Sequence, residues 1–191
     1  YYKNPEANAE VFDGDWFKTG DLGRMDEDGY IHITGRKKEI YVSSGGKNVA
    51  PLVIEETMKS IPVLSQVFLV GDGRKYCSAL VTLDAGVILR DNLGMNPDKV
   101  PKDPIEQIEE LERRGHKLSD FVESEEIRSD IESQIMELNK RFMNPEQIKK
   151  FTILPRDLNI DSGELTPTLK IRRKQIRENW AAEIEAMYSD A

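Results

Sequence analysis

The chain has 191 residues, of which 38% are hydrophobic and 32% charged, and its formal net charge is −8. A chain of this length forms one domain or slightly more. The acidic balance argues against nucleic acid as the main partner, because phosphate binding favours a basic surface. No apolar run is long enough to span a bilayer, and the single cysteine, Cys77, excludes a disulfide framework and favours a reducing compartment.

The first residues, "YYKNPEANAEVF", carry no signal peptide or other targeting pattern, and we expect the chain to be a piece of a larger protein. After the turn "DEDG", the alternating residues of "YIHITG" predict a strand that ends at a glycine. Tyr41 and Val42 predict a second short β segment. Pro51 is typical of a helix start, and Pro62 ends that helix.

The segments "QVFLV" and "CSALVTL", separated by the turn "GDG", predict two antiparallel strands. Cys77 lies in the second of them, where packing in the core is a better interpretation than catalysis.

From about residue 85 to 145 the pattern becomes helical and strongly charged, with Asp103-Pro104 as a helix start. An apolar stripe in this region indicates a face packed on the core. Its members are Ile127, Ile131, Ile135, Leu138 and Phe142. A strand, "KFTIL", and a last amphipathic helix with Ile176, Trp180, Ile184 and Tyr188 complete the chain. Hairpins outnumber strict βαβ alternation, so we expect an α+β fold: a small mixed or antiparallel sheet flanked by helices, with a charged helical insertion.

Four short stretches contain residues that could bind a ligand or take part in catalysis. In "WFKTGDLG", Asp21 follows a Thr-Gly turn, where a carboxylate can accept two hydrogen bonds from a ribose diol. In "GRKKE", Arg36 can pair with a phosphate, but taken alone the cations are better explained as solvated turn residues. In "SSGGKNVAP", Gly45 and Gly46 allow the backbone to approach a ligand closely, or form a tight turn.

The fourth stretch, "GELTPTLKIRRKQI", places Lys170 at a loop-to-helix junction. A compact ammonium there can polarise a carboxylate and a phosphate together, or can simply be a solvated side chain. Arg172, Arg173 and Lys174 lie at the start of the predicted helix, where the helix dipole disfavours cations. The crowding predicts an acidic group nearby, either a carboxylate or a phosphate.

In this order, the motifs "WFKTGDLG", "DGYIHITGRKKEI", "SSGGKNVAPLVIEE" and "LTPTLKIRRKQI" closely resemble those of the adenylate-forming enzymes, and among them the long-chain fatty-acyl-CoA synthetases. The resemblance covers nearly the whole chain. It implies that residues 1–35 are the end of a large N-terminal adenylation domain, of which they form a β-hairpin remnant. It also implies that residues 36–191 are the mobile C-terminal domain of the same enzyme. The helical insertion also resembles the long-chain branch.

The resemblance further implies a role for each matching residue. Asp21 resembles the aspartate that binds ribose, and Arg36 resembles an arginine that contacts the nucleotide. Lys38 falls on the hinge position, and Lys170 matches the lysine that serves adenylation. Gly45 and Gly46 resemble the loop that lines the channel for the pantetheine of CoA.

One position departs from the family pattern, because many members have glycine where this chain has Leu169, before Lys170. We interpret the leucine as a mark of the long-chain branch.

The implied activity is an ATP-dependent, AMP-forming ligation of a long-chain fatty acid to CoA, with Mg²⁺, in a full-length protein. The chain alone is expected to be inactive, since the phosphate loop and acyl pocket lie upstream. Its implied partners are the N-terminal adenylation domain, ATP or AMP, CoA and fatty acid, in the cytoplasm or peripherally at a membrane. Two alternatives stay open: a ligase for an aryl, short-chain or amino acid, and a non-catalytic regulatory or interaction module.

Overall fold

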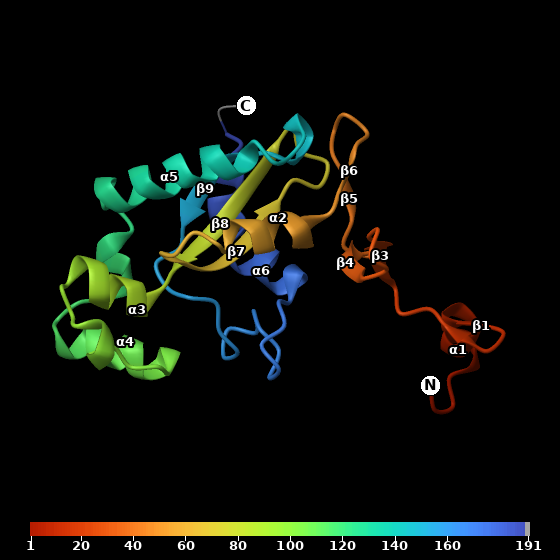
Figure 1. Ribbon diagram of the computed structural model, residues 1–191, viewed down its shortest axis with the longest axis horizontal. Coiled ribbons are helices and arrows are strands. Elements are labelled where there is room, and N and C mark those ends of the chain that lie inside the picture. Colours follow the sequence, from red (N-terminus) through yellow and green to blue (C-terminus); the bar gives the residue numbers. More distant parts are fainter. Residues whose placement is uncertain (190–191) are drawn as a thin grey trace.

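The computed structural model describes residues 1–189 and is an α+β structure (Figure 1). Its strands are β1 (Phe12–Asp13), β2 (Trp16–Phe17), β3 (Asp21–Met25), β4 (Ile31–Arg36), β5 (Tyr41–Val42), β6 (Asn48–Val49), β7 (Leu64–Val70), β8 (Cys77–Leu83) and β9 (Ile148–Ile153). Its α-helices are α1 (Pro5–Val11), α2 (Pro51–Met58), α3 (Ala85–Val87), α4 (Pro104–Arg113), α5 (Glu125–Asn139), α6 (Arg173–Asn179) and α7 (Ala181–Ala186). Short 3₁₀ or π turns are η1 (Ile88–Asn92), η2 (Pro97–Lys99), η3 (Leu118–Phe121) and η4 (Asn144–Glu146).

The centre of the fold is a three-stranded sheet in the order β7-β8-β9. β7 and β8 are antiparallel, as the sequence predicts, and β9 joins the other side of β8 in parallel. A mixed sheet of this kind results because the connection from β8 to β9 is the long helical insertion, which can return the chain to the same end of the sheet. The expected α+β class with a small mixed sheet is therefore confirmed.

Helices cover both faces of this sheet. One hydrophobic core packs β7 and β8 against α2, α3 and α5, with Val67, Val81 and Ile131 among its buried residues. The second core packs Phe68 and Leu80 against the C-terminal helices. Every residue of β8 is buried, which explains why its sequence is a continuous apolar run instead of an alternating one.

The insertion is helical, as the sequence predicts. Asp103 caps α4, because its side chain accepts hydrogen bonds from the backbone N–H groups of Ile105 (2.8 Å) and Glu106 (3.3 Å). The stripe on α5 faces the core, with Ile127, Ile131 and Ile135 buried and Leu138 and Phe142 packed beside them.

The last helix differs from the prediction, because two short helices, α6 and α7, replace one. They meet at Trp180, which has φ −114° and ψ 29°, outside the helical range. Its indole N–H donates to buried Glu164 at 2.8 Å. This hydrogen bond to a distant residue lies at the break between α6 and α7. The apolar residues of both helices still pack on one hydrophobic core, as the sequence predicts.

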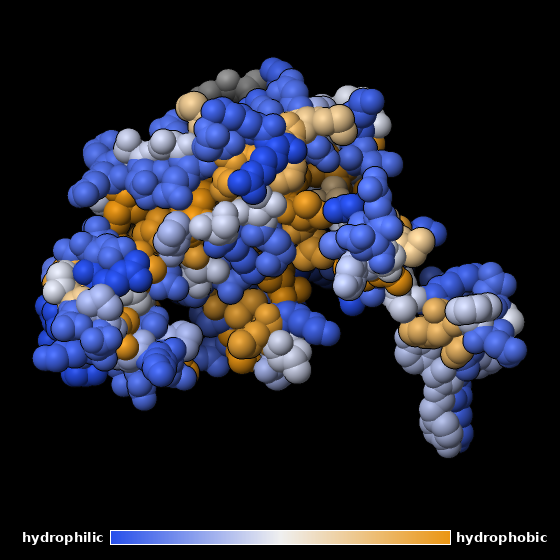
Figure 2. Space-filling model, viewed as in Figure 1, coloured by the Kyte–Doolittle hydropathy of each residue, from blue (hydrophilic) through white to orange (hydrophobic). Residues whose placement is uncertain are grey.

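The first 35 residues form small elements outside both cores. β1 pairs with β2, β3 pairs with β4, and only Gly35 among residues 1–35 is buried. Helix α1 was not expected, although Asn4 before Pro5 is a helix-start signal, and Asn4 does cap it through the Ala7 N–H at 3.0 Å. Large apolar side chains of this segment are exposed, and Figure 2 shows apolar atoms on the surface of the lobe that contains α1 and β1. The exposed apolar side chains of residues 1–35 include Trp16 and Phe17 on β2, and Met25, Ile31 and Ile33 on β3 and β4.

Within residues 1–189, no helix is both long enough and apolar enough to cross a membrane.

Candidate functional site

The structure brings Asp21 and Arg36 together. They are partners in the register of the β3–β4 hairpin, where Asp21 begins β3 and Arg36 ends β4. Arg36 Nε lies 3.0 Å from Asp21 Oδ1, and the Arg36 side chain is more than half exposed. The two residues predicted to contact the ribose and the nucleotide therefore lie side by side at the open end of the β3–β4 hairpin. Their roles stay predictions.

Lys38, the predicted hinge, lies between two segments that are each held in place. On one side, the Lys37 N–H donates to the Gly20 carbonyl at 2.8 Å, which joins Lys37 to the β3–β4 hairpin. On the other side, Glu39 accepts a hydrogen bond from Arg173 of α6 at 3.0 Å. The Lys38 side chain is 89% exposed, and its Nζ is 3.6 Å from Glu10. This surface ion pair contributes little to stability. The turn that contains Lys38 is closed by the backbone N–H groups of Glu39 (2.9 Å) and Ile40 (3.2 Å), which both donate to the Arg36 carbonyl.

Gly45 and Gly46 form the turn between β5 and β6. The Gly46 N–H donates to the Ser43 carbonyl at 2.8 Å, and Gly46 has φ +75°, a conformation that favours glycine. The turn is exposed. The strand before it is tied to the next loop, since the Gly73 N–H donates to the Val42 carbonyl at 3.2 Å.

Lys170 lies on a small loop between Leu165 and Ile171, which pair as an antiparallel bridge. Its backbone is fixed at both ends: its N–H donates to Thr166 Oγ1 at 3.0 Å, and its carbonyl accepts from the Thr166 N–H at 2.8 Å. The residue is exposed and stands three positions before α6. The Lys170 side chain is therefore exposed on a loop whose backbone is held by hydrogen bonds, and its role stays a prediction.

Leu169 has φ +60° in this loop, in the left-handed region. The family pattern of glycine at this position has a physical reason here, because glycine adopts this conformation without strain. The Leu169 side chain is 69% exposed and adds little packing. The loop thus keeps the shape that glycine would favour even though leucine occupies the position.

The acidic group predicted near the cations of α6 is a pair of carboxylates from this chain. Arg173 donates from Nη1 and Nη2 to the two oxygens of Glu55, each at 2.7 Å, and from Nε to Glu39. Glu55 is buried and also accepts the Leu69 N–H at 2.8 Å. Burial alone would lower the pKa of Arg173, but hydrogen bonds and charge from Glu55 and Glu39 hold it above its usual value.

Sequence reasoning missed this cluster, which we call the Arg173 cluster (Arg173, Glu39 and Glu55). Its one sequence signal was the unfavourable placement of cations at a helix start. Through these contacts, the start of α6 is joined both to helix α2 and to the residue directly after the predicted hinge.

A second buried carboxylate was also missed. Glu164 is fully buried and accepts hydrogen bonds from Arg156 at 2.7 and 2.8 Å, and from Asn179 and Trp180. Burial alone would raise its pKa, but the hydrogen bonds from Arg156 and Asn179 lower it below the usual value. A buried charge with this many donors is stable as a charge, and Glu164 fixes the loop between β9 and α6.

Cys77 is buried, as the sequence predicts. Its Sγ is 3.2 Å from the Tyr41 hydroxyl and 3.1 Å from the Pro145 carbonyl. Burial raises the pKa of the thiol, which disfavours the thiolate that a nucleophile requires. A role in packing follows.

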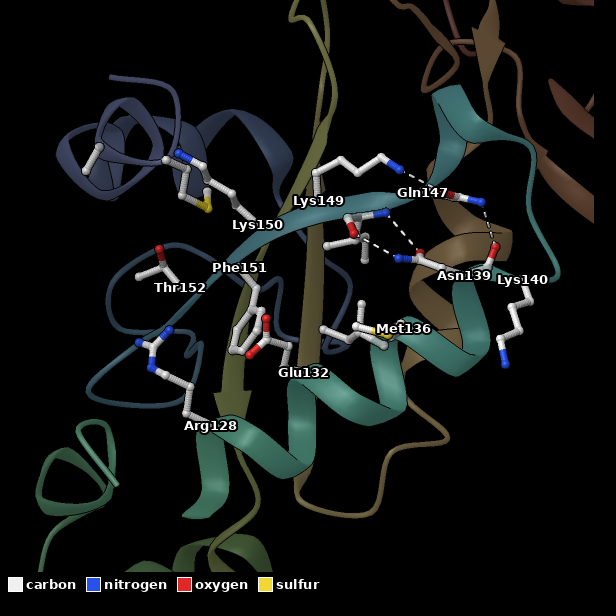
Figure 3. Close-up of a pocket in the computed structure, with 14 residues that line it drawn as sticks. Arg128, Glu132, Met136, Asn139, Lys140, Gln147, Lys149, Lys150, Phe151 and Thr152 are labelled. Carbon is white, nitrogen blue, oxygen red and sulfur yellow. Dashed lines mark hydrogen bonds between the residues drawn. The ribbon is translucent and has the colours of Figure 1, made fainter. Parts of the chain in front are cut away.

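The surface of the described residues is hollowed near the predicted hinge and, separately, beside β9. A cavity of about 270 Å³ lies between the hinge and α6, with Lys38, Ile171 and Arg177 among its lining residues. A larger groove, of about 730 Å³, lies between α5 and β9 and contains none of the predicted site residues (Figure 3). Size therefore does not locate the candidate chemistry, and the smaller cavity is the one beside the predicted hinge.

The predicted site residues do not form one constellation. Among the residues that the structure describes, no contact joins Lys170 to Asp21 or Arg36, and Figure 1 shows β3 and β4 apart from α6. In the same described part of the chain, no group of three or more His, Cys, Asp or Glu side chains is arranged to hold a metal ion.

Comparison with solved structures shows which fold this is. The A-PCP didomain of carboxylic acid reductase from Segniliparus rugosus, in complex with AMP, superposes with a TM-score of 0.66 over 100% of this chain and 23% of that one, at 23% identity. The O-succinylbenzoate Coenzyme A synthetase of Bacillus subtilis, in complex with AMP, superposes with a TM-score of 0.53 over 93% of this chain and 27% of that one, at 20% identity. At these identities the likeness concerns the fold.

Sequence comparison places the chain in a family. The model of the AMP-binding enzyme C-terminal domain matches residues 38–120 and 108–191, so the chain belongs to that family. The long-chain-fatty-acid–CoA ligase FadD15 of Mycobacterium tuberculosis is 39% identical over 99% of this chain. The human long-chain-fatty-acid–CoA ligase ACSBG1 is 34% identical over 100% of it. The chain spans 29% and 27% of the lengths of these two relatives.

Proposed function

We propose that this chain is the C-terminal part of an ATP-dependent, AMP-forming long-chain fatty acid–CoA ligase. The observation that carries the proposal is the similarity to long-chain ligases, which runs at 33–39% identity across 99–100% of the chain. It favours this substrate class over an aryl, short-chain or amino acid, and an enzyme over a non-catalytic module.

In the proposed reaction, a carboxylate oxygen of the fatty acid attacks the α-phosphorus of ATP, and pyrophosphate leaves. The CoA thiol then attacks the acyl carbon of the acyl-adenylate, and AMP leaves. Lys170 serves the first step, because an exposed ammonium on a fixed backbone can neutralise charge on the carboxylate and the α-phosphate together. Asp21 and Arg36 hold the ribose and a phosphate. The turn at Gly45 and Gly46 lines the path of pantetheine in the second step.

The two steps require two arrangements of the domain, with Lys38 as the pivot. The burial pattern supports a boundary near this residue: the hydrophobic cores of the described chain begin at Tyr41, and residues 1–35 contribute none of their side chains. Apolar residues are exposed both on β2 and on the β3–β4 hairpin, and we propose that the adenylation domain covers them. ATP, CoA and Mg²⁺ are proposed cofactors of the full-length protein, which we place in the cytoplasm or at a membrane surface.

The test compares full-length protein with its Lys170→Ala variant in two assays. Formation of acyl-adenylate from palmitate, ATP and Mg²⁺ should fall about a hundredfold to a thousandfold, the scale for loss of one electrostatic contact to a transition state. Conversion of supplied palmitoyl-adenylate and CoA to thioester should be retained.

Equal loss in both assays would contradict the role of Lys170, and a parent protein that activates benzoate or an amino acid but not palmitate would contradict the substrate class. The chain of 191 residues, assayed alone, is expected to release no AMP above background, because it supplies only one wall of the site.

A further inference from the structure

The Arg173 cluster lies between the two parts of the chain to which the proposed function assigns roles, the pivot at Lys38 and the loop of Lys170. Its guanidinium lies in the interior, with 17% of the side chain exposed, between two carboxylates from different elements. Glu39 is the residue directly after Lys38, and Glu55 lies on α2. Arg173 begins α6, three positions after Lys170. One side chain therefore connects the pivot, the body of the domain and the loop that carries the proposed adenylation lysine.

The contacts to Glu55 are structural. Glu55 is 97% buried on its side chain, accepts two hydrogen bonds from Arg173 and a third from the backbone of β7. The guanidinium also stacks over the Phe68 ring at 5.4 Å. Removal of Arg173 would leave the buried carboxylate of Glu55 without its charged partner, which destabilises a fold. This half of the cluster anchors α6 to the sheet.

The contact to Glu39 serves a different purpose. Glu39 is a third exposed, and the segment from Tyr41 onward has its own anchors: Tyr41 is buried, the Gly73 N–H donates to Val42, and the Ser44 N–H donates to the Arg74 carbonyl at 3.2 Å. The turn at Gly45 and Gly46 is therefore held without Glu39. What the Glu39 contact adds is a direct link between the first residue after the pivot and the start of α6.

We propose that Glu39 and Arg173 are positioning residues, which fix the Lys170 loop to the pivot so that rotation at Lys38 delivers Lys170 in one defined place. The inference rests on the proposed function and deepens it. The small cavity between the hinge and α6, lined by Lys38 and by Ile171 next to Lys170, lies at this junction. Because Glu55 still holds α6, loss of the Glu39 contact would free the residue next to the pivot relative to α6. A misplacement of about 1 Å at a reacting group costs up to about a hundredfold in rate.

The experiment uses full-length protein with the Glu39→Ala substitution. Arg173 is not replaced, because its removal would also leave the buried Glu55 carboxylate without a charged partner. Acyl-adenylate formation should fall about tenfold to a hundredfold in kcat, with KM for ATP unchanged. Thioester formation from supplied palmitoyl-adenylate should stay within about twofold. Glu39→Gln keeps an acceptor for Arg173 Nε–H and should recover part of the lost rate. The matched control is Glu185→Ala, which removes another long-range arginine partner, that of Arg74, away from the pivot.

Unchanged adenylation in Glu39→Ala overturns the proposal, as does an equal loss in both half-reactions or an equal loss in Glu185→Ala. Lys170→Ala in the same assays separates the two levels of inference. If Lys170→Ala abolishes adenylation and Glu39→Ala does not, only the positioning role fails. If neither variant affects adenylation, the roles of Lys170 and Glu39 both fail, whereas a full-length protein that forms no palmitoyl-adenylate would contradict the proposed function.

Discussion

Leu169 shows how a single residue can occupy a conformation that its type disfavours. Its φ of +60° is enforced by the hydrogen bonds of the loop, in which the Leu169 N–H donates to the Thr166 carbonyl at 2.8 Å and Lys170 is bonded to Thr166 at both ends. The left-handed conformation costs about 1–2 kcal/mol for an L residue. The surrounding bonds offset this cost, so the strain lies directly beside the proposed adenylation residue.

Replacement of this leucine by glycine should stabilise the chain. Leu169→Gly removes the strain and loses little burial, while the greater freedom of glycine in the unfolded state opposes part of the gain. We expect the free energy of unfolding to rise by about 0.5–1 kcal/mol, measured by urea denaturation. Leu169→Ile is the matched variant, because a β-branched residue tolerates this φ even less. A stability order with isoleucine above glycine would contradict the interpretation.

At the scale of elements, the edge of β9 is protected by the end of α5. The amide of Asn139 donates to the Ile148 carbonyl at 2.9 Å and accepts the Ile148 N–H at 3.0 Å, as a neighbouring strand would. Lys149 and Lys150 follow on the same strand, and Figure 3 shows Phe151 pointing toward α5, where Arg128 lies 5.4 Å from its ring centroid. A short, charged and capped edge resists pairing with other strands.

Asn139→Ala should therefore weaken the contact between α5 and the sheet. It leaves both backbone groups of Ile148 unpaired, at a cost of about 1–3 kcal/mol in the free energy of unfolding. Gln134→Ala, on the same helix, is the control, since Gln134 bonds only to Asp130 one turn away, and we expect a change within about 0.5 kcal/mol. Chemical denaturation of both variants measures the difference. Equal effects would mean that the amide of Asn139 does not support the edge.

For the whole molecule, two buried carboxylates connect segments that are distant in sequence. Glu55 joins α2 to α6 through Arg173. Glu164 closes the loop after β9 on its own Arg156 and joins that loop to Asn179 and Trp180 of the C-terminal helices. The Glu164 carboxylate keeps these donors as long as it stays ionised. The stability of the domain is therefore sensitive to protonation of Glu164, whose pKa is lowered in the folded state.

The sign of this pH dependence follows from linkage. A carboxyl whose pKa is lower in the folded state than in the unfolded state contributes stability above its unfolded pKa, near 4.5 for glutamate. That contribution is lost as the pH falls through the folded pKa. We expect ¹³C NMR titration of the Glu164 carboxyl to give a midpoint below 4.5. We also expect the free energy of unfolding to decrease on acidification below that value. A midpoint above it would contradict the ionised, fully bonded carboxylate.

The sequence by itself determined the α+β class, the hairpin of β7 and β8, the helical insertion with its buried stripe, and the family. These depend on local signals: alternation, apolar spacing, turn glycines and helix-start residues such as Asp103 act through neighbours in the chain. The motif order also named Asp21, Arg36, Gly45, Gly46 and Lys170 as candidates and Lys38 as the hinge, and these roles stay predictions for experiment. The location of Cys77 in the core was predicted from its apolar context.

Only the tertiary structure decided which cations and carboxylates meet. Arg173 and Glu39 are separated by 134 positions, and Arg173 and Glu55 by 118, so no local pattern pairs them. The division of the last helix at Trp180 and the parallel pairing of β9 with β8 likewise depend on partners distant in sequence. Local patterns specify the elements because their energetics act over a few residues. The pairing of buried charges depends on how the finished layers stack, since only burial makes an unpaired charge costly.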